Sequence, residues 1–357
     1  MIVNGKKQLA GLRIGVDLGG TKIECVVLGS SGAELWRKRI PAPRGDYVET
    51  IKVVANLVQE AEREADVICS VGIGTPGAIS AASGLMKNCN STWLNGMPFK
   101  RDLETALDRE VRIANDANCF ALSEAVDGAA QDARIVFGVI LGTGVGGAIV
   151  VDGQVLEGCN SIAGEWGHNP LPWPRDGELP GTACYCGKSG CVETFLSGPG
   201  IVDDYIRSHG LESHRSQNHG SQEYGSQNHG SQNNGPKNTG SQDRGPRDAG
   251  SESRAHCGPG SLISARDVFA YAEAGEPDAL ACVDRYMDRL ARALAHVINI
   301  VDPHVIVLGG GVSNVARIYH DVTRLWGRYI FSDSVATRLL RNTHGDASGV
   351  RGAAWLW

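Results

Sequence analysis

Residues 13–29 read RIGVDLGGTKIECVVLG, two runs rich in apolar and β-branched residues on either side of the pair Gly19-Gly20. Tight glycine turns between such runs are typical of antiparallel strands. The next run, ELWRKRIP at 34–41, has the composition of a third strand. The segment therefore predicts a three-stranded antiparallel meander.

The chain repeats this pattern. A helix at 47–64, a strand at 67–77 and a strand-to-helix unit at 111–130 are expected after the meander. A second glycine-turned hairpin follows at 135–158, and a helix end, strand and glycine turn at 297–314. The fold class predicted is α/β, with two related layered domains facing each other across a cleft. We expect residues 1–130 to form the first domain, completed by a C-terminal helix at 347–357, and residues 131–346 to form the second.

Length and composition restrict the function. The 357 residues suffice for about two domains. A net charge of −6 argues against a nucleic-acid or anionic-membrane partner. We find no apolar run of membrane-spanning length, about 20 residues, and no signal-peptide pattern at the start. The expected location is cytoplasmic.

One segment fits neither domain. From Gly220 to Gly250 a glycine recurs at every fifth residue, among polar side chains. Apolar residues are too few there to offset the entropy of ordering, so 212–257 is predicted to be a disordered, low-complexity surface insertion. A partner-recognition segment remains an alternative.

Three thiols lie within CYCGKSGC, residues 184–191. They could form one disulfide and leave a free thiol, act as a redox pair, or bind a metal. A Cys-x-x-Cys pair is absent, a Cys184–Cys186 disulfide would be strained, and disulfides are rare in reducing compartments. His168 supplies a fourth ligand, which predicts a Cys3His zinc site formed by His168, Cys184, Cys186 and Cys191. With all four positions filled by protein, the zinc would be structural.

Other residues suggest chemistry on a phosphorylated ligand. DLGGTK at 17–22, LGTGVGG at 141–147 and LGGGVSN at 308–314 place glycines in turns whose N–H groups can hold phosphate oxygens. Asp116 at the start of a helix is either a helix cap or a general base that accepts the proton of a substrate hydroxyl. Glu165 and His168, three residues apart, share a face if the segment turns helically.

Eight motifs, in this order, resemble the ROK family (repressors, open reading frames, kinases) of bacterial sugar kinases: DLGGTK, PGAIS, NCNSTWLNG, ANDANC, GTGVGG, GEWGHNP, CYCGKSGCVET and VIVLGGG. The resemblance covers nearly all of 13–200 and 261–357. It implies the actin-like, ribonuclease H-like fold, with ATP and a sugar bound between the domains. The implied activity is ATP-dependent phosphorylation of a hexose, fructose or mannose first, to the 6-phosphate.

The resemblance also implies residue roles. Asp116 would be the catalytic base, and Asp17 would lie near Mg2+. The implied sugar contacts are Asn90, Asn115, Asp116, Glu165, His168 and Glu193. The implied ATP contacts are Gly19, Gly20, Thr21, Lys22, Thr143, Gly144, Gly309, Gly310 and Gly311. His168 would have two roles, with one ring nitrogen on zinc and the other on the sugar.

Several alternatives stay open. A glucokinase or an N-acetylhexosamine kinase of the same family would carry the same motifs. A sugar-sensing repressor of the family would need a helix-turn-helix domain, and only sixteen residues precede Asp17. An ATPase of the chaperone or actin class would not need Glu165, His168 and a zinc loop. The sequence leaves the preferred hexose undecided, and a homodimer, suggested by the resemblance, is likewise undecided.

Overall fold

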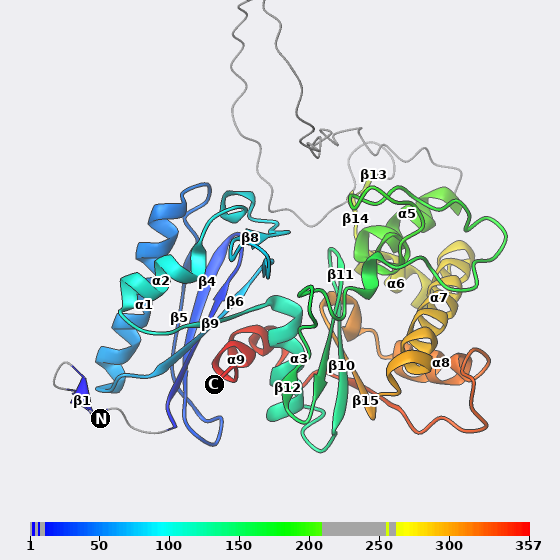
Figure 1. Ribbon diagram of the computed structural model, residues 1–357. Helices are drawn as coiled ribbons and strands as arrows, with labels where there is room; N and C mark the ends of the chain where they lie inside the picture. Colours follow the sequence, from blue (N-terminus) through cyan, green and yellow to red (C-terminus); the bar gives the residue numbers. More distant parts are fainter. Residues whose placement is uncertain (1, 4–5, 8–10, 209–254, 257–261) are drawn as a thin grey trace, which may run out of the picture.

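The computed structural model describes residues 2–3, 6–7, 11–208, 255–256 and 262–357, and within these it contains two five-stranded mixed sheets (Figure 1). The first sheet has the order β5-β4-β3-β6-β9 and the second β12-β11-β10-β15-β16. The first sheet comprises β3 (Arg13–Leu18), β4 (Lys22–Leu28), β5 (Glu34–Pro41), β6 (Ser70–Thr75) and β9 (Arg112–Asn115). The second comprises β10 (Ile135–Leu141), β11 (Val145–Val151), β12 (Gln154–Val155), β15 (Val305–Gly309) and β16 (Arg338–Arg341).

The two sheets share one topology. In each, the first three strands form an antiparallel meander, a fourth strand pairs in parallel with the first, and a fifth pairs in parallel with the fourth. The repeated pattern of meander followed by alternating helices and parallel strands confirms the predicted two-domain α/β fold.

Helices cover the outer face of each sheet (Figure 1). On the first sheet these are α1 (Tyr47–Ala65) and α2 (Phe99–Leu107), and on the second α5 (Gly198–Ser208), α6 (Ala265–Glu273), α7 (Pro277–Val301) and α8 (Arg317–Trp326). Helix α1 illustrates how the sequence encodes them. The Asp46 side chain accepts the Glu49 N–H at 2.9 Å and caps its start. A stripe of Val54, Leu57 and Val58 then packs into the first domain's core.

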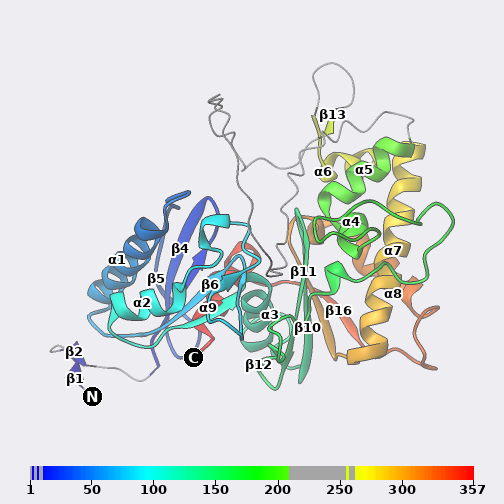
Figure 2. The same cartoon turned by 45° about the horizontal axis from the view of Figure 1, so that its top comes forward.

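Two helices lie between the sheets: α3 (Asp116–Val126) and α9 (Ser348–Ala354) (Figures 1 and 2). Glycines allow their close approach. A Cβ at Gly72 on β6 would lie 1.8 Å from the Ala353 carbonyl oxygen, and one at Gly352 would lie 1.6 Å from that of Cys119. Helix α9 thus packs on the first sheet, and it is shorter than the predicted 347–357. The domain limits at residues 130 and 346 stay predictions.

The remaining elements are short. Two-residue strands are β1 (Ile2–Val3), β2 (Lys6–Lys7), β7 (Ala78–Ile79), β8 (Met86–Lys87), β13 (Ala255–His256) and β14 (Leu262–Ile263). Single helical turns are η1 (Thr92–Leu94), η2 (Trp166–His168), η3 (Gly311–Asn314) and η4 (Gly345–Ala347), and α4 (Val192–Leu196) is little longer. These short elements include the loops that carry the candidate site.

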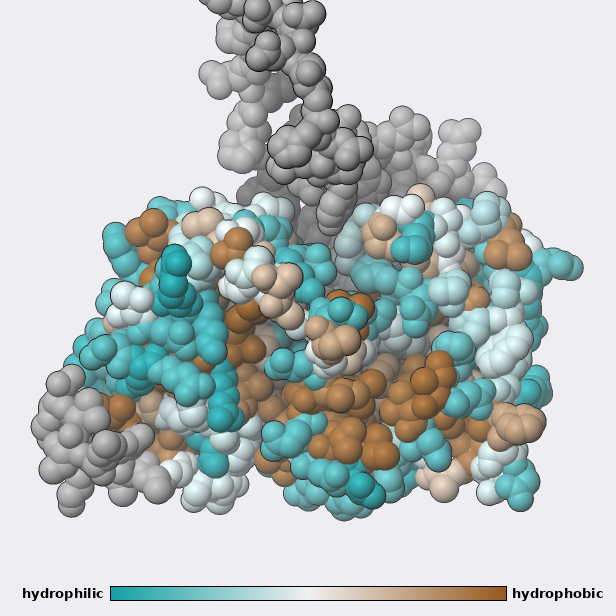
Figure 3. All heavy atoms as spheres, in the orientation of Figure 1, coloured by the Kyte–Doolittle hydropathy of each residue, from teal (hydrophilic) through white to brown (hydrophobic). Residues whose placement is uncertain are grey.

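Two predictions concern the surface. The insertion expected at 212–257 lies outside the described residues, apart from β13. Among the helices that the structure describes, none has both the length and the hydrophobicity needed to cross a membrane. Hydrophobic side chains gather over the second sheet, whereas the first domain is mainly hydrophilic on the same face (Figure 3).

Candidate functional site

Asp116 begins α3, between the two sheets. The cap of this helix is the preceding residue, because the Asn115 side-chain oxygen accepts the Asn118 N–H at 2.7 Å. The Asp116 carboxylate accepts the adjacent Ala117 N–H at 2.8 Å. Its side chain keeps exposed surface, yet the protein atoms crowded around it desolvate the carboxylate and raise the pKa of Asp116. Of the two roles considered for Asp116, that of helix cap is therefore taken by Asn115.

Asp17, near the end of β3 in the first sheet, is a second carboxylate that interacts with Asp116. Burial first, and then the charges of Asp116 and Glu24, raise the pKa of Asp17 to about 6, against the opposing effect of Lys22. Glu24 is itself buried and paired with Arg39 at 2.6 Å. Asp17 and Asp116 thus form a pair of interacting carboxylates between the sheets. We call the region around Asp17, Asp116 and Glu165, between the two sheets, the junction.

The segment before His168 packs directly on the second sheet. Trp166 Nε1 donates to the Gly146 carbonyl at 3.0 Å. A Cβ at Gly147 would lie 2.5 Å from the Trp166 ring, and one at Gly167 would lie 2.1 Å from the Val145 carbonyl oxygen. The glycines of two separate motifs, GTGVGG and GEWGHNP, therefore let the two segments touch, which fixes Glu165 and His168 beside β11.

Glu165 interacts with the other predicted polar residues. Partial burial raises the pKa of Glu165, the charge of His168 lowers it, and Asp116 and Glu193 raise it again. The segments that carry these residues also pack on one strand. The Cβ of Ala117, next to Asp116, lies 3.4 Å from a Cβ placed at Gly146 of β11, which also accepts Trp166 Nε1, and Glu193 accepts the Val145 N–H. The structure thus gathers the segments of Asp116, Glu165, His168 and Glu193 at β11, from positions up to 77 residues apart in the sequence.

Glu193 links this cluster to a glycine turn. It lies in α4, directly after the cysteine segment, and its Oε2 accepts the Val145 N–H at 2.9 Å. The Gly142 carbonyl accepts the N–H of Gly198, at the start of α5, at 2.8 Å. A predicted sugar contact is therefore hydrogen-bonded to the hairpin predicted to hold ATP.

The four predicted metal ligands are His168, Cys184, Cys186 and Cys191, and one ligand atom from each lies within 4.8 Å of the other three. Cys186 Sγ and Cys191 Sγ are 3.6 Å apart, as are Cys184 Sγ and His168 Nδ1. A tetrahedral zinc with bonds of about 2.3 Å to sulfur and about 2.0 Å to nitrogen requires separations of about 3.8 Å and 3.5 Å. A disulfide would need about 2.05 Å. The geometry fits a tetrahedral ion.

A short ladder and a turn build this arrangement. Leu171 N–H donates to the Gly190 carbonyl at 3.0 Å, and Val192 N–H to the Asn169 carbonyl at 2.9 Å, which places Cys191 beside His168. The Gly187 N–H donates to the Cys184 carbonyl at 3.0 Å and closes a β-turn that has Tyr185 and Cys186 at its centre. Gly187 has a φ of 85°, which favours glycine.

Tyr185 is a site residue that the sequence reasoning missed. Its hydroxyl lies 2.9 Å from His168 Nε2, the ring nitrogen that faces away from the cysteines. The two rings are perpendicular, with centroids 5.0 Å apart. Burial, followed by the nearby charge of Glu193, raises the pKa of Tyr185. The only sequence signal for this residue is its position between two predicted ligands.

Lys87 of β8 was also missed, and its sequence context carries no signal. Its Nζ donates to the Asn160 carbonyl, beyond β12, at 2.9 Å. Its charge also lowers the pKa of Glu165, against the larger effect of burial. Lys87 thus connects the first domain to the loop of the second that precedes Glu165.

The predicted ATP contacts divide into accessible and buried residues. Gly20, Thr21, Thr143, Gly310 and Gly311 are exposed, while Gly19, Lys22 and Gly144 are partly buried. Gly309 is buried, and a Cβ there would lie 2.4 Å from the Phe120 ring. For Gly309 the structure shows a packing role, while Gly310 and Gly311 stay predicted ATP contacts.

The predicted sugar contact Asn90 is exposed. It directly precedes Ser91, whose Oγ lies 3.5 Å from a Cβ placed at Gly20.

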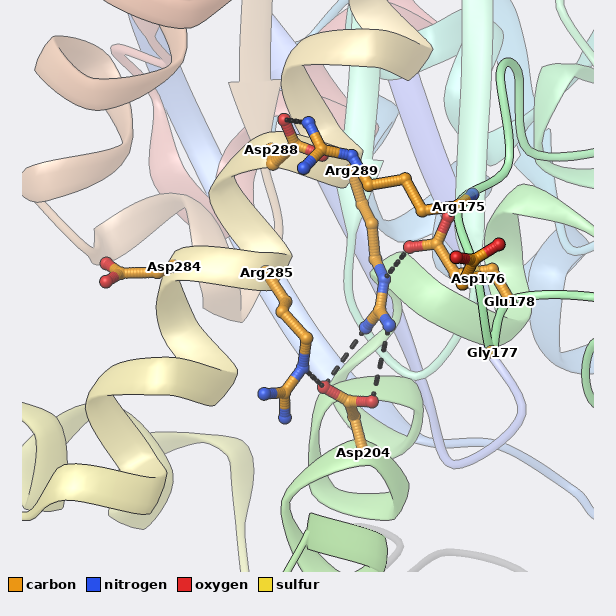
Figure 4. Close-up of a pocket in the computed structure, with 9 residues that line it drawn as sticks. All are labelled: Arg175, Asp176, Gly177, Glu178, Asp204, Asp284, Arg285, Asp288 and Arg289. Atoms are coloured by element: carbon orange, nitrogen blue, oxygen red, sulfur yellow. Dashed lines mark hydrogen bonds and ion pairs between the residues drawn. The ribbon is translucent and has the colours of Figure 1, made fainter.

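A separate pocket of about 550 Å³ lies between α5, α7 and the 175–178 loop (Figure 4). No predicted site residue lines it. Its buried carboxylates are already paired: Glu178 accepts Arg289 Nε at 2.8 Å, and Asp204 lies 3.1 Å from Arg289 Nη1. Figure 4 shows these side chains pointing toward one another. The pocket is therefore a charge network that holds the loop leading into the predicted metal ligands, and the junction remains the candidate active site.

The repeated sheets, with α3 and α9 between them, define a two-domain protein of the actin-like ATPase fold. A family model described as "ROK family" matches residues 13–357, so the chain belongs to the ROK family. The predicted resemblance is confirmed.

Relatives agree along nearly the whole chain. An N-acetyl-D-glucosamine kinase of Yersinia pseudotuberculosis is 36% identical over 346 residues, which cover 96% of this chain and 97% of that protein. The crystal structure of a ROK hexokinase from Thermus thermophilus superposes with a TM-score of 0.74 at 28% identity, covering 96% of this chain and 97% of the other. A ROK family glucokinase from Streptomyces griseus, solved with glucose and AMPPNP, has a TM-score of 0.67 at 23% identity, covering 97% and 99%; this likeness shows the fold alone.

Proposed function

We propose that the protein is an ATP-dependent sugar kinase that phosphorylates a hydroxyl group of a hexose at the junction, with Asp116 as general base. The observation that carries the proposal is that the segments of Asp116, Glu165, His168 and Glu193 all pack on β11, beside a glycine turn of the actin-like fold. Family membership and the kinase relatives support it.

The reaction needs one proton transfer and one phosphoryl transfer. As the sugar hydroxyl approaches, the Asp116 carboxylate accepts its proton, and the oxygen forms a bond to the γ-phosphorus of ATP. The bond between that phosphorus and the bridging β,γ-oxygen breaks, and ADP leaves with the electron pair. A raised pKa makes the Asp116 carboxylate a stronger proton acceptor than an ordinary aspartate.

The exposed glycine turns supply N–H groups for the phosphates, with Gly20 in the first domain and Thr143, Gly310 and Gly311 in the second. Asp17 would hold Mg2+. The fit rests on the donor chemistry, since carboxylate oxygens are ligands that Mg2+ prefers. Burial first, and then the charge of Asp116, raises the pKa of Asp17, so a divalent cation would stabilise its ionised form. When bound, the cation neutralises phosphate charge.

His168, Cys184, Cys186 and Cys191 would hold a structural zinc ion. Since protein fills all four positions, the ion would serve to fix the loop. His168 and Glu193 flank that loop at its two ends, so fixing it also fixes two of the proposed sugar contacts.

The identity of the sugar is a finer question. Fructose and mannose were expected from the sequence, but the 36% identical relatives are named N-acetyl-D-glucosamine kinases. We therefore propose N-acetylglucosamine as the first substrate to test, ahead of glucose, mannose and fructose. A coupled ADP-release assay over these four sugars decides between them, and ATP hydrolysis that ignores every sugar would refute the kinase proposal.

The Asp116→Asn variant tests the base. We expect kcat to fall by about 10²- to 10⁴-fold while calorimetry still detects sugar binding, because the amide keeps the shape but accepts no proton. Asp333→Asn, on an exposed loop, serves as the matched control and should leave both values unchanged. Turnover of Asp116→Asn close to that of the wild type would show that another group takes the proton.

A further inference from the structure

Tyr185 occupies a position that its own packing does not explain. It is 67% exposed, yet its hydroxyl lies 2.9 Å from His168 Nε2. The β-turn closed by the Gly187 N–H holds its backbone at the rim of the metal loop. An exposed tyrosine gains little from packing, so the contact with His168 accounts for its orientation.

The metal ligands fix the chemistry of this contact. His168 Nδ1 faces Cys184 Sγ at 3.6 Å and would bind a metal through its lone pair. The proton of the neutral ring must then be on Nε2, which makes Nε2 a donor. The Tyr185 hydroxyl oxygen accepts that hydrogen bond, as a sugar hydroxyl oxygen would.

The hydroxyl also lies where the sugar is proposed to bind. Glu165 and Glu193 are both close enough to influence Tyr185 electrostatically, and Glu165 interacts in the same way with Asp116. The Tyr185 hydroxyl thus contacts one proposed sugar contact, His168, and lies within electrostatic range of two others. The tyrosine hydroxyl and a sugar oxygen cannot both accept the hydrogen bond of His168 Nε2, so a sugar that uses this nitrogen must displace the tyrosine.

We propose that Tyr185 is an internal substitute for a sugar oxygen: in the sugar-free protein its hydroxyl accepts the hydrogen bond of His168 Nε2, and a bound sugar displaces it. This inference rests on the proposed function and deepens it, because it makes Tyr185 a residue that sets sugar affinity. Holding the imidazole in its donor tautomer before the sugar arrives keeps the site ready, at the cost of weaker sugar binding.

The proposal predicts the sign of a mutational effect. Tyr185→Phe keeps the ring but removes the hydroxyl. Sugar binding to this variant therefore breaks no hydrogen bond within the protein. The free energy of one hydrogen bond within the protein, relative to the same bond made with water, corresponds to about a 2- to 10-fold change in affinity. Sugar Kd and sugar KM should therefore fall by about 2- to 10-fold in the variant, with kcat unchanged within about twofold.

The test uses the purified full-length protein and whichever of the four hexoses the wild type phosphorylates fastest. Calorimetry without nucleotide gives Kd, steady-state assays give KM and kcat, and elemental analysis gives bound metal. Tyr185→Leu, which also lacks the hydroxyl, should tighten binding in the same direction. Tyr271→Phe in α6, another exposed tyrosine, is the matched control and should change none of these values.

Each outcome either supports or overturns the proposal. Tighter sugar binding in Tyr185→Phe with metal content equal to the wild type supports the proposal. Weaker or unchanged binding overturns it, since Tyr185 would then contact the sugar directly or play no part. Loss of metal from both Tyr185 variants also overturns it, because the hydroxyl would be support for the metal ligand alone. Failure of the proposed function is distinguishable, as the wild type itself would then phosphorylate none of the sugars.

Discussion

Glu178 holds the loop that carries the predicted metal ligands against helix α7, and we expect its loss to destabilise the second domain. Its Oε1 accepts Arg289 Nε and Arg292 Nη2, both at 2.8 Å, and Arg292 is fully buried. Glu178 also lies on the loop between His168 and Cys184, so it connects the metal loop to α7 (Figure 4). Glu178→Gln keeps the size of the side chain but leaves two buried guanidinium groups without their shared carboxylate.

The structure gives the magnitude. Burial alone raises the pKa of Glu178, but hydrogen bonds from Arg292, the Arg175 N–H and Arg289 outweigh it and lower the value to about 2. Relative to the ordinary 4.5, this corresponds to about 3 kcal/mol of stability. Breaking a buried ion pair from one side independently costs about 3–5 kcal/mol. The exposed fraction of Glu178 is 6%, so solvent screening calls for no reduction. We expect Glu178→Gln to lose about 3 kcal/mol at pH 7.

Urea denaturation from pH 8 to pH 2 measures this loss. The pKa of Glu178 is depressed in the folded state, so its stabilisation is complete above the unfolded value near 4.5 and disappears as the pH falls toward 2. The difference between wild type and Glu178→Gln should be constant down to about pH 5.5 and then shrink. Asp132→Asn, which breaks the exposed pair with Arg338, is the control and should give no measurable change. A Glu178→Gln variant that behaves like this control would refute the reasoning.

Two further predictions concern the site. Cys184→Ser removes one of the four metal ligands and loosens the loop beside His168 and Glu193, so sugar affinity should fall by about tenfold or more while ATP affinity changes little; calorimetry with each ligand checks this, and equal losses would contradict it. Asp17→Asn should raise the melting temperature at pH 7–8, because a carboxyl whose folded pKa is raised to about 6 destabilises the folded state once it is ionised. That gain should disappear below about pH 4, where the wild-type carboxyl is protonated in both states, and a gain independent of pH would count against the assigned cause.

Local patterns in the sequence predicted much of the fold. The glycine-turned meander at 13–41 and its repeat at 135–158 both form as expected, because strand runs and tight turns depend on neighbouring residues. The ligand set was predictable for a similar reason. Three cysteines within eight residues and one histidine nearby leave few chemical alternatives, and the structure brings these four side chains together.

Residues whose roles depend on distant partners were not predictable. The sequence could not decide whether Asn115 or Asp116 caps α3, because both residue types suit a cap and only the backbone geometry selects one. It gave Gly309 a ligand role, whereas the ring of Phe120, which lies 189 residues earlier, makes it a packing residue. Lys87 and Asn160 lie in different domains, and no local signal links them.

The sequence by itself therefore determined the two repeated units, the cluster of one histidine and three cysteines, and the family, all of which are encoded in short segments whose chemistry is independent of the rest of the chain. Only the tertiary structure decided which groups meet at the junction. The hydrogen bond from Val145 to Glu193, the charge interaction of Asp17 with Asp116 and the hydroxyl of Tyr185 on His168 all depend on how separate segments pack. Each of these contacts joins segments that are far apart in the sequence, so it forms only when the whole chain has packed.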